Sequence, residues 1–269
     1  MATPSTPVPA TDVGSTAVPV LHLCGGPYVT ADGGRKEVPE GSKRLLVFVA
    51  LHRGRVERRC AAGTLWPIGD DVRASGNLRS ALWRLRTAGI DLLTADKWSL
   101  RLCDDVSVDV HLMSDWASRL IRGTPSSGDL AVLPWLADAL ELLPGWYDDW
   151  VLLERERIRQ RMLHALEALS RALIRARRWA EAVEAALMAV SAEPLRESAQ
   201  RALIEAHVAE GNWIEGRRSF EAYRDLLRGE LGAEPPADLM VGVPSTHRRT
   251  SGFRDEPSWQ PGGRLSVVP

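Results

Sequence analysis

The order of apolar and polar positions divides the chain into two parts. Residues 20–110 mix short β-prone runs with short helical patterns, whereas residues 111–232 keep a helical period throughout. Pro-, Ser- and Thr- or Gly-rich segments flank both parts. We therefore expect a disordered leader at 1–18, a first domain at 19–110 and a helical domain at 111–233. A mostly disordered tail should follow at 234–269, at most loosely docked at 239–243.

The first domain combines two hairpins with three helices. A β-prone run at 20–29 breaks at 25–27, and the turn at 32–34 before residues 35–38 predicts the first hairpin. A second hairpin should join 92–94 to 98–102 and be followed by a last strand at 106–110.

Three helices are expected between these hairpins. Ser42 is a plausible N-cap for the first helix, and Gly54 would end it. The second should run from about 57 to 66 and end at Pro67, and the third from about 72 to 88. Helix, helix, turn, helix and hairpin is the order of a winged helix-turn-helix, in which the last helix lies in the DNA major groove.

The third helix has two unlike faces. At 100° per residue its apolar residues, Leu78, Ala81, Leu82 and Leu85, share one side. The other side and its flank carry side chains able to contact phosphates and bases: Arg73, Asn77, Arg79, Ser80, Trp83, Arg84 and Arg86. We expect all of these except Arg86 to approach the major groove, with Arg79 and Arg84 as the main contacts to phosphate or guanine. The alternative is a polar face that meets only water or the second domain.

Charge is distributed unevenly, although the formal net charge is −1. Residues 41–90 hold ten basic and three acidic residues, and the basic ones are nearly all Arg. Residues 91–150 hold four basic and eleven acidic residues. A basic segment in the region of the predicted recognition helix is what contact with a phosphate backbone requires. On the second hairpin, Lys97 and Trp98 are expected to touch the adjacent DNA backbone.

The helical part shows a 34-residue period, which is the tetratricopeptide (TPR) spacing. Trp179, Ala182, Ala186 and Ala189 recur as Trp213, Gly216, Phe220 and Tyr223. Pro144 could close an earlier, irregular repeat through Leu136 and Ala139. Small residues at these places would let paired helices approach closely. The sequence therefore predicts a TPR-like helical bundle.

Signals for catalysis and metal binding are missing from the sequence. It has no GxxxxGK[ST], HExxH or GxSxG motif, and no histidine has metal-ligand spacing. The aspartate pairs at 70–71, 104–105 and 148–149 are expected to be caps or turns, and the aromatic residues Trp146, Tyr147 and Trp150 to fill a core. Three widely spaced cysteines suit a reducing cytosol, and no apolar run is long enough for a membrane span. We expect a cytoplasmic protein that is not an enzyme, with no catalytic residues, cofactor or metal.

Specific motifs resemble a known family. Leu65-Trp66-Pro67, Asn77-Leu78-Arg79 and Arg84-Leu85-Arg86 resemble the DNA-binding domain of OmpR-type regulators, and most of all the Streptomyces antibiotic regulatory protein (SARP) family. The segments 144–150, 193–197, 209–211 and 230–235 resemble the bacterial transcriptional activation domain (BTAD) that follows it. The wing turn departs from the family in having Lys97 where glycine is usual, and the second helix departs in having Gly63.

The resemblance implies a transcriptional activator that binds promoter direct repeats on double-stranded DNA, as a homodimer there, and recruits RNA polymerase holoenzyme. It also implies control of a secondary-metabolite (antibiotic) gene cluster. We expect no receiver domain before the winged helix and therefore no phosphorylation control of that kind. A second reading stays open. The repeat domain could be a protein- or ligand-sensing adaptor, with a winged helix that contacts proteins.

Overall fold

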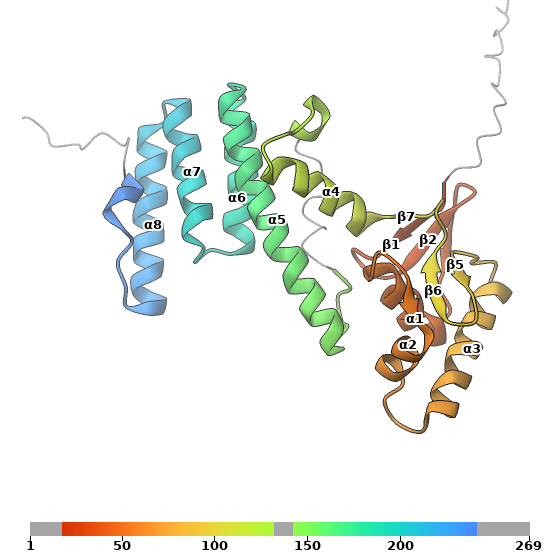
Figure 1. Ribbon diagram of the computed structural model, residues 1–269. Coiled ribbons are helices and arrows are strands. Elements are labelled where there is room, and N and C mark those ends of the chain that lie inside the picture. The colour runs from red at the N-terminus through yellow and green to blue at the C-terminus, as the bar shows by residue number, and fades with distance from the viewer. Residues whose placement is uncertain (1–17, 132–141, 241–269) are drawn as a thin grey trace, which may run out of the picture.

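The computed structural model describes residues 18–131 and 142–240, and it is elongated, with a mixed α/β half followed by a row of helices (Figure 1). The first half opens with β1 (Val20–His22), β2 (Tyr28–Ala31) and β3 (Gly34–Glu37). These strands form an antiparallel sheet in which Leu21 pairs with Val29, and β7 (Ser107–Val108) joins β1 in parallel. The predicted first hairpin is confirmed. The last strand is shorter than the predicted 106–110, because the next helix begins at Asp109.

Three helices follow in the predicted order: α1 (Glu40–Leu51), α2 (Arg58–Leu65) and α3 (Asp71–Thr87). The expected N-cap of the first helix is wrong. Helix α1 begins two residues before Ser42, after Pro39, and Ser42 is buried. Its hydroxyl donates to the Ala81 carbonyl of α3 at 2.9 Å, so this serine joins two helices. The end of α1 is also made differently, since Arg53 and not Gly54 takes the left-handed conformation, with φ at +46°.

The second hairpin is confirmed as β5 (Leu93–Ala95) and β6 (Ser99–Leu102). A short strand, β4 (Val56–Glu57), pairs with β6 and gives the order β4-β6-β5. Because β4 leads directly into α2, this sheet ties the wing to the three-helix core.

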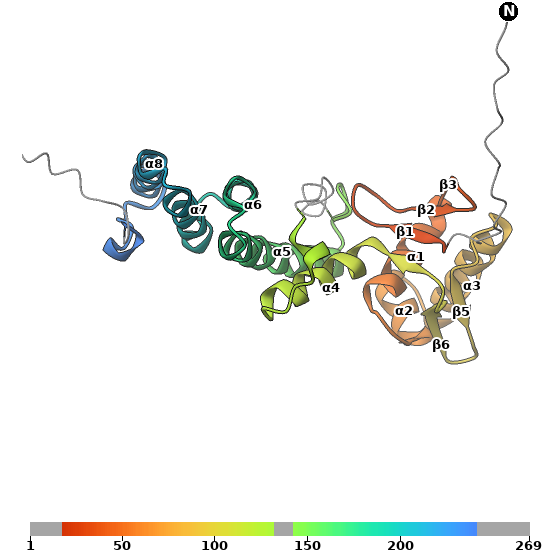
Figure 2. The same cartoon turned by 90° about the horizontal axis from the view of Figure 1, so that it is seen from above.

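The helical half contains α4 (Asp109–Ile121), α5 (Asp149–Arg175), α6 (Trp179–Ala192), α7 (Glu197–Glu210) and α8 (Trp213–Leu231). Figures 1 and 2 show α5 to α8 side by side in a row that leads away from the winged-helix half. Trp179 and Trp213, which the 34-residue period relates, are the first residues of α6 and α8. Ala182, Ala186 and Ala189 are fully buried, and Gly216 lies against α7. The earlier repeat expected through Leu136 and Ala139 lies outside the described residues.

Residues 234–240, predicted to belong to a mostly disordered tail, are docked on the bundle. A 3-10 helix, η4 (Ala237–Met240), buries Leu239 among Ile204, Tyr223 and Leu227. Asp238 adds an ion pair with Arg201 at 3.1 Å. Apolar burial on α7 and α8 therefore holds this segment. The remaining flanking residues, 1–17 and 241–269, lie outside the described part of the chain.

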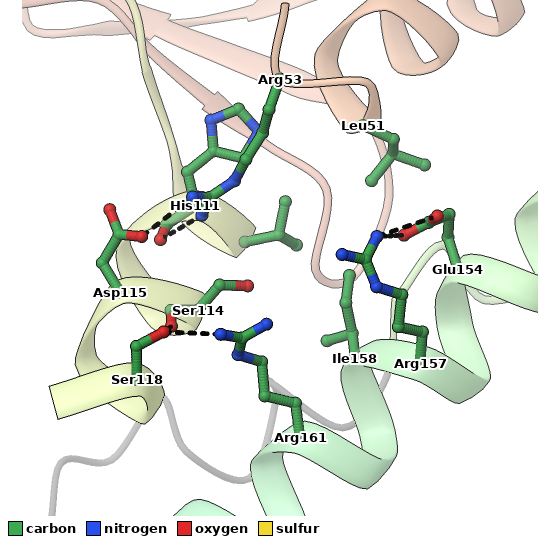
Figure 3. Close-up of a pocket in the computed structure, with 11 residues that line it drawn as sticks. Leu51, Arg53, His111, Ser114, Asp115, Ser118, Glu154, Arg157, Ile158 and Arg161 are labelled. Carbon is green, nitrogen blue, oxygen red and sulfur yellow. Dashed lines mark hydrogen bonds and ion pairs between the residues drawn. The ribbon is translucent and has the colours of Figure 1, made fainter. Parts of the chain in front are cut away.

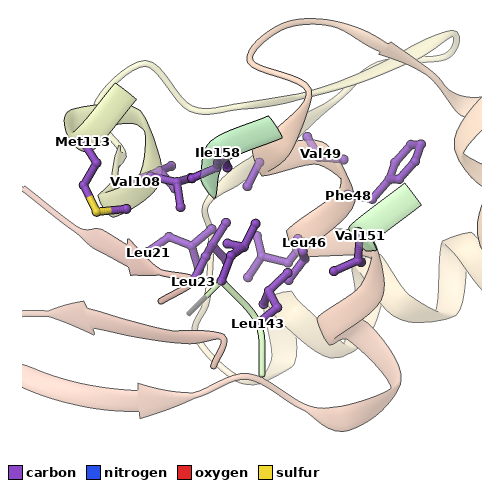
Figure 4. Close-up of a cluster of buried hydrophobic side chains, with 14 of the residues drawn as sticks. Leu21, Leu23, Leu46, Phe48, Val49, Val108, Met113, Leu143, Val151 and Ile158 are labelled. Atoms are coloured by element: carbon purple, nitrogen blue, oxygen red, sulfur yellow. The ribbon is translucent and has the colours of Figure 1, made fainter. Parts of the chain in front are cut away.

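One hydrophobic core runs through both halves of the molecule. Figure 4 shows its central part, where side chains of β1 and α1 meet those of α4, α5 and the segment before α5. Leu143 donates its amide hydrogen to the Leu23 carbonyl at 3.1 Å, and Trp150 packs edge-on against Phe48 with ring centroids 5.2 Å apart. Arg44 of α1 forms an ion pair with Asp148. The two halves are therefore joined by packed side chains as well as by the chain itself.

Candidate nucleic-acid interface

Helix α3 is held by its apolar face and capped at its start. Asp70 accepts a hydrogen bond from the Arg73 amide at 2.8 Å, which satisfies one of the free amide groups of the first turn. Ala74, Leu78, Ala81 and Leu85 are buried against α1 and α2. This fixed inner face leaves the opposite side of the helix turned outward. Figure 1 shows α3 at the end of the molecule away from α6, α7 and α8.

The outward side of α3 carries unpaired cations. Arg73, Arg79 and Arg86 are exposed, and none forms an ion pair with another residue in the described part of the chain. Trp83 between them is 66% exposed, Ser80 is exposed, and Asn77 is half-buried. Leaving the apolar ring of Trp83 in water is unfavourable, so its exposure beside these guanidinium groups favours a role in binding. Such a surface is suited to an anionic partner with flat groups.

Arg84 lies differently from the other predicted contacts. Its Nη2 donates to the Gly41 carbonyl at the start of α1 at 3.1 Å, and its Nε is buried without a hydrogen-bond partner among the described residues. A side chain at position 41 would come within 2.9 Å of this guanidinium. Arg84 is therefore engaged with α1, and its side chain is less available to a partner than those of Arg73, Arg79 and Arg86.

The wing turn is closed by one carboxylate. Asp96 Oδ1 accepts the amide hydrogens of Trp98 and Ser99, both at 2.7 Å, and Oδ2 accepts from the Ser99 hydroxyl and from Arg55. These bonds, those from the two amides first, hold the pKa of Asp96 well below its usual value. Lys97 has no left-handed backbone angle, so the turn needs no glycine at that position.

The tip of the wing presents Lys97 and Trp98 to solvent. Trp98 is 73% exposed, and the Lys97 ammonium lies 4.9 Å from the centre of its ring. Behind the tip, the Arg58 side chain donates to the Asp96 carbonyl at 3.2 Å. The wing is thus bound to the start of α2 as well as to β4.

Two arginines of α2 were missed as candidates. Arg59 is exposed at the start of this helix and reaches Asp71 of α3 at 3.3 Å, while Arg58 lies beneath the wing. Both belong to the basic segment 41–90. The charge count of residues 41–90 included both arginines. The helical pattern of the short α2, however, could not show that they lie on the same side of the molecule as the exposed face of α3.

Most of the other residues that the sequence analysis singled out hold the fold together. Asp70 caps α3, Asp104 pairs with Arg101 at 2.6 Å, and Asp148 pairs with Arg44. Trp146 and Trp150 pack against the core, whereas Tyr147 is exposed. Within the described ranges 18–131 and 142–240, no three His, Cys, Asp or Glu side chains gather as a metal site. No described helix combines the length and apolarity of a membrane span.

Comparisons with known proteins agree with this architecture. Residues 123–241 match the family model of the bacterial transcriptional activator domain. Among solved structures, the chain is similar to Mycobacterium tuberculosis EmbR in complex with a low-affinity phosphopeptide, with a TM-score of 0.64 and 19% identity. The similarity covers 84% of this chain but only 64% of the EmbR chain, and no curated protein matches the sequence. Residues 123–241 thus match a bacterial transcriptional activator domain, and the likeness to EmbR shows the fold of the chain, a winged-helix half followed by a helical domain.

Proposed function

We propose that this chain is a SARP-type transcriptional regulator, a sequence-specific DNA-binding activator whose α3 enters the major groove. The observation that carries the proposal is the row of unpaired arginines, Arg73, Arg79 and Arg86, beside the exposed Trp83 on a helix whose other face is buried. Arginine can bind guanine or phosphate through two parallel hydrogen bonds. Arg79 is the main candidate, because Arg84 already donates to α1.

The neighbouring groups would set the position of α3 on the duplex. Lys97 and Trp98 would rest on the DNA backbone next to the groove, and Arg59 would reach a phosphate on the other side of α3. Asn77 and Ser80 can donate to or accept from base edges along the groove. Phosphate contacts would fix the register, and the contacts from α3 would read the sequence.

The helical half would then act on the transcription machinery or on a second protomer. The family match over residues 123–241 supports a role in activation. From the family resemblance we propose binding as a homodimer at direct repeats upstream of a promoter, contact with RNA polymerase holoenzyme, and control of a secondary-metabolite gene cluster. Run-off transcription with purified polymerase tests this part. Transcripts should increase with the full chain, and no increase on DNA that the protein occupies would refute activation.

DNA binding is best tested by fluorescence anisotropy on the intergenic DNA beside the chain's own gene, with a shuffled duplex as competitor. Arg79→Ala should weaken binding by about 1–3 kcal/mol and relax the preference at one base pair. The matched control is Arg175→Ala, since Arg175 is exposed at the end of α5 and has no ion pair among the described residues. This control should bind like the parent chain.

The salt dependence and a double variant complete the test. Affinity should fall steeply as salt rises from about 50 to 200 mM, because phosphate contacts release counterions. If Arg79→Ala combined with Arg84→Ala leaves binding unchanged, α3 is not the recognition helix. An adaptor whose winged helix contacts proteins would show no sequence preference and little dependence on salt.

A further inference from the structure

We propose that the joint between the two halves binds a small oxyanion. A cavity of about 110 Å³ lies where the end of α1 meets α4 and α5. Figure 3 shows that its charged side chains come from α4, from α5 and from the turn after α1, whereas α1 itself contributes the apolar Leu51. The lining includes Arg53, His111, Ser114, Ser118, Arg157 and Arg161. This site is separate from α3 and goes beyond the DNA-binding function.

Arg161 is the central group of the proposed site. Its Nη2 donates to the Ser118 hydroxyl at 2.6 Å, and it has no carboxylate partner among the described residues. Its Nε is buried without a hydrogen-bond partner in the same part of the chain. A half-buried guanidinium that lacks a counter-charge carries an uncompensated solvation cost, which an anion beside it would offset.

The surrounding charges leave the cavity electropositive. Arg53 is paired with Asp115 at 2.9 Å and Arg157 with Glu154 at 3.2 Å, so Arg161 is the third arginine beside two carboxylates that are already paired. His111 Nε2 lies 2.8 Å from the Ala50 carbonyl, to which it donates. Burial first, and then the nearby Arg53, lower the pKa of His111, so the imidazole adds no charge at neutral pH.

The size and donors of the cavity define the class of ligand. A volume of about 110 Å³ is that of a few water molecules, at about 30 Å³ each. Phosphate, or a carboxylate group, fits this space and can accept from a guanidinium and from the Ser114 hydroxyl together. An anion held there would connect α4 and α5 to the turn after α1, and so would stabilise the relative placement of the two halves.

The test is a thermal melt of the full chain with inorganic phosphate or succinate, at an ionic strength matched with sodium chloride. A single bound anion at about ten times its Kd should raise Tm by about 3 °C, with saturation. Arg161→Gln should weaken the response at least about tenfold, and Arg161→Lys should weaken it as well because it loses the planar fork. Arg79→Ala and Arg175→Gln should keep it.

The variants separate this site from the DNA surface. If phosphate acted on α3, Arg79→Ala would lose the Tm shift while Arg161→Gln kept it, and the proposal would be wrong. It would also be wrong if neither anion raised Tm more than chloride did. A response to phosphate alone or to succinate alone supports the site and identifies the class of anion. If Arg161→Gln does not fold, an undiminished response of Arg161→Lys would refute the proposal.

Discussion

The close packing between α7 and α8 predicts that a small side chain at position 216 stabilises the protein and that a large one destabilises it. Gly216 is buried in α8, and a Cβ atom there would lie 3.6 Å from His207 Cβ and from Val208 Cγ2. These are ordinary van der Waals distances, so alanine fits without displacing α7. Because glycine within a helix costs about 1 kcal/mol relative to alanine, Gly216→Ala should stabilise the fold by about 1 kcal/mol.

A larger side chain should reverse that gain. Gly216→Leu adds three further carbon atoms beyond a Cβ that is already in contact, and overpacking of this kind costs about 1–3 kcal/mol. The matched control is Gly229 of the same helix, where a Cβ would have no neighbour within 4 Å. Gly229→Leu should therefore not destabilise the protein.

Circular dichroism melts of the parent chain and these three variants measure this difference, with urea unfolding as a second measurement. A change of 1 kcal/mol corresponds to about 2–4 °C in Tm for a chain of this size. Gly216→Ala should melt above the parent chain and Gly216→Leu below it. If Gly216→Leu were as stable as Gly216→Ala, α7 and α8 could not be packed as closely as the structure has them.

Two further predictions concern single carboxylates. Asp129 accepts both Arg119 Nε at 2.9 Å and Nη2 at 2.7 Å, and these bonds chiefly hold its pKa well below the usual value. A lowered folded-state pKa stabilises the protein above the unfolded value of about 3.9 and loses this effect as pH falls. Asp129→Asn should therefore lower Tm equally between about pH 6 and 8, and the difference from the parent should shrink in melts below about pH 4; a constant difference would contradict the ion pair. Asp96→Ala should loosen the wing turn, lower Tm and weaken DNA binding in the anisotropy assay, whereas unchanged affinity would show that the wing does not contact DNA.

The sequence predicted those elements whose periodicity is long or whose turns are distinctive. Helix α3 is 17 residues long, and its apolar residues recur at helical spacing. The positions of Leu78, Ala81 and Leu85 therefore define which face is buried and which is exposed. The 34-residue period placed Trp179 and Trp213 at equivalent helix starts for the same reason. The identity of the groups on the outer face of α3 therefore follows from the amino-acid sequence by itself.

Other features depended on contacts between distant segments. Serine suits both an N-cap and a buried bond between helices, so Ser42 could not be assigned without knowing that Ala81 lies beside it. The position of Arg84 depends on the Gly41 carbonyl, which is 43 residues away in the chain. In the wing turn, Asp96 accepts two amide hydrogens, and Lys97 stands where glycine is usual without needing a left-handed backbone angle, which a search for turn residues does not predict.

The shared core of the two halves has a consequence for how movement could pass along the molecule. Phe48 belongs to the same helix that receives Arg84 of α3, and it packs on Trp150 at the start of the 27-residue helix α5. A tilt of α3 would therefore be carried through α1 to the start of α5. Because α5 is 27 residues long, a small rotation at its start would displace its far end, and α6 to α8 with it, further than α3 itself moved.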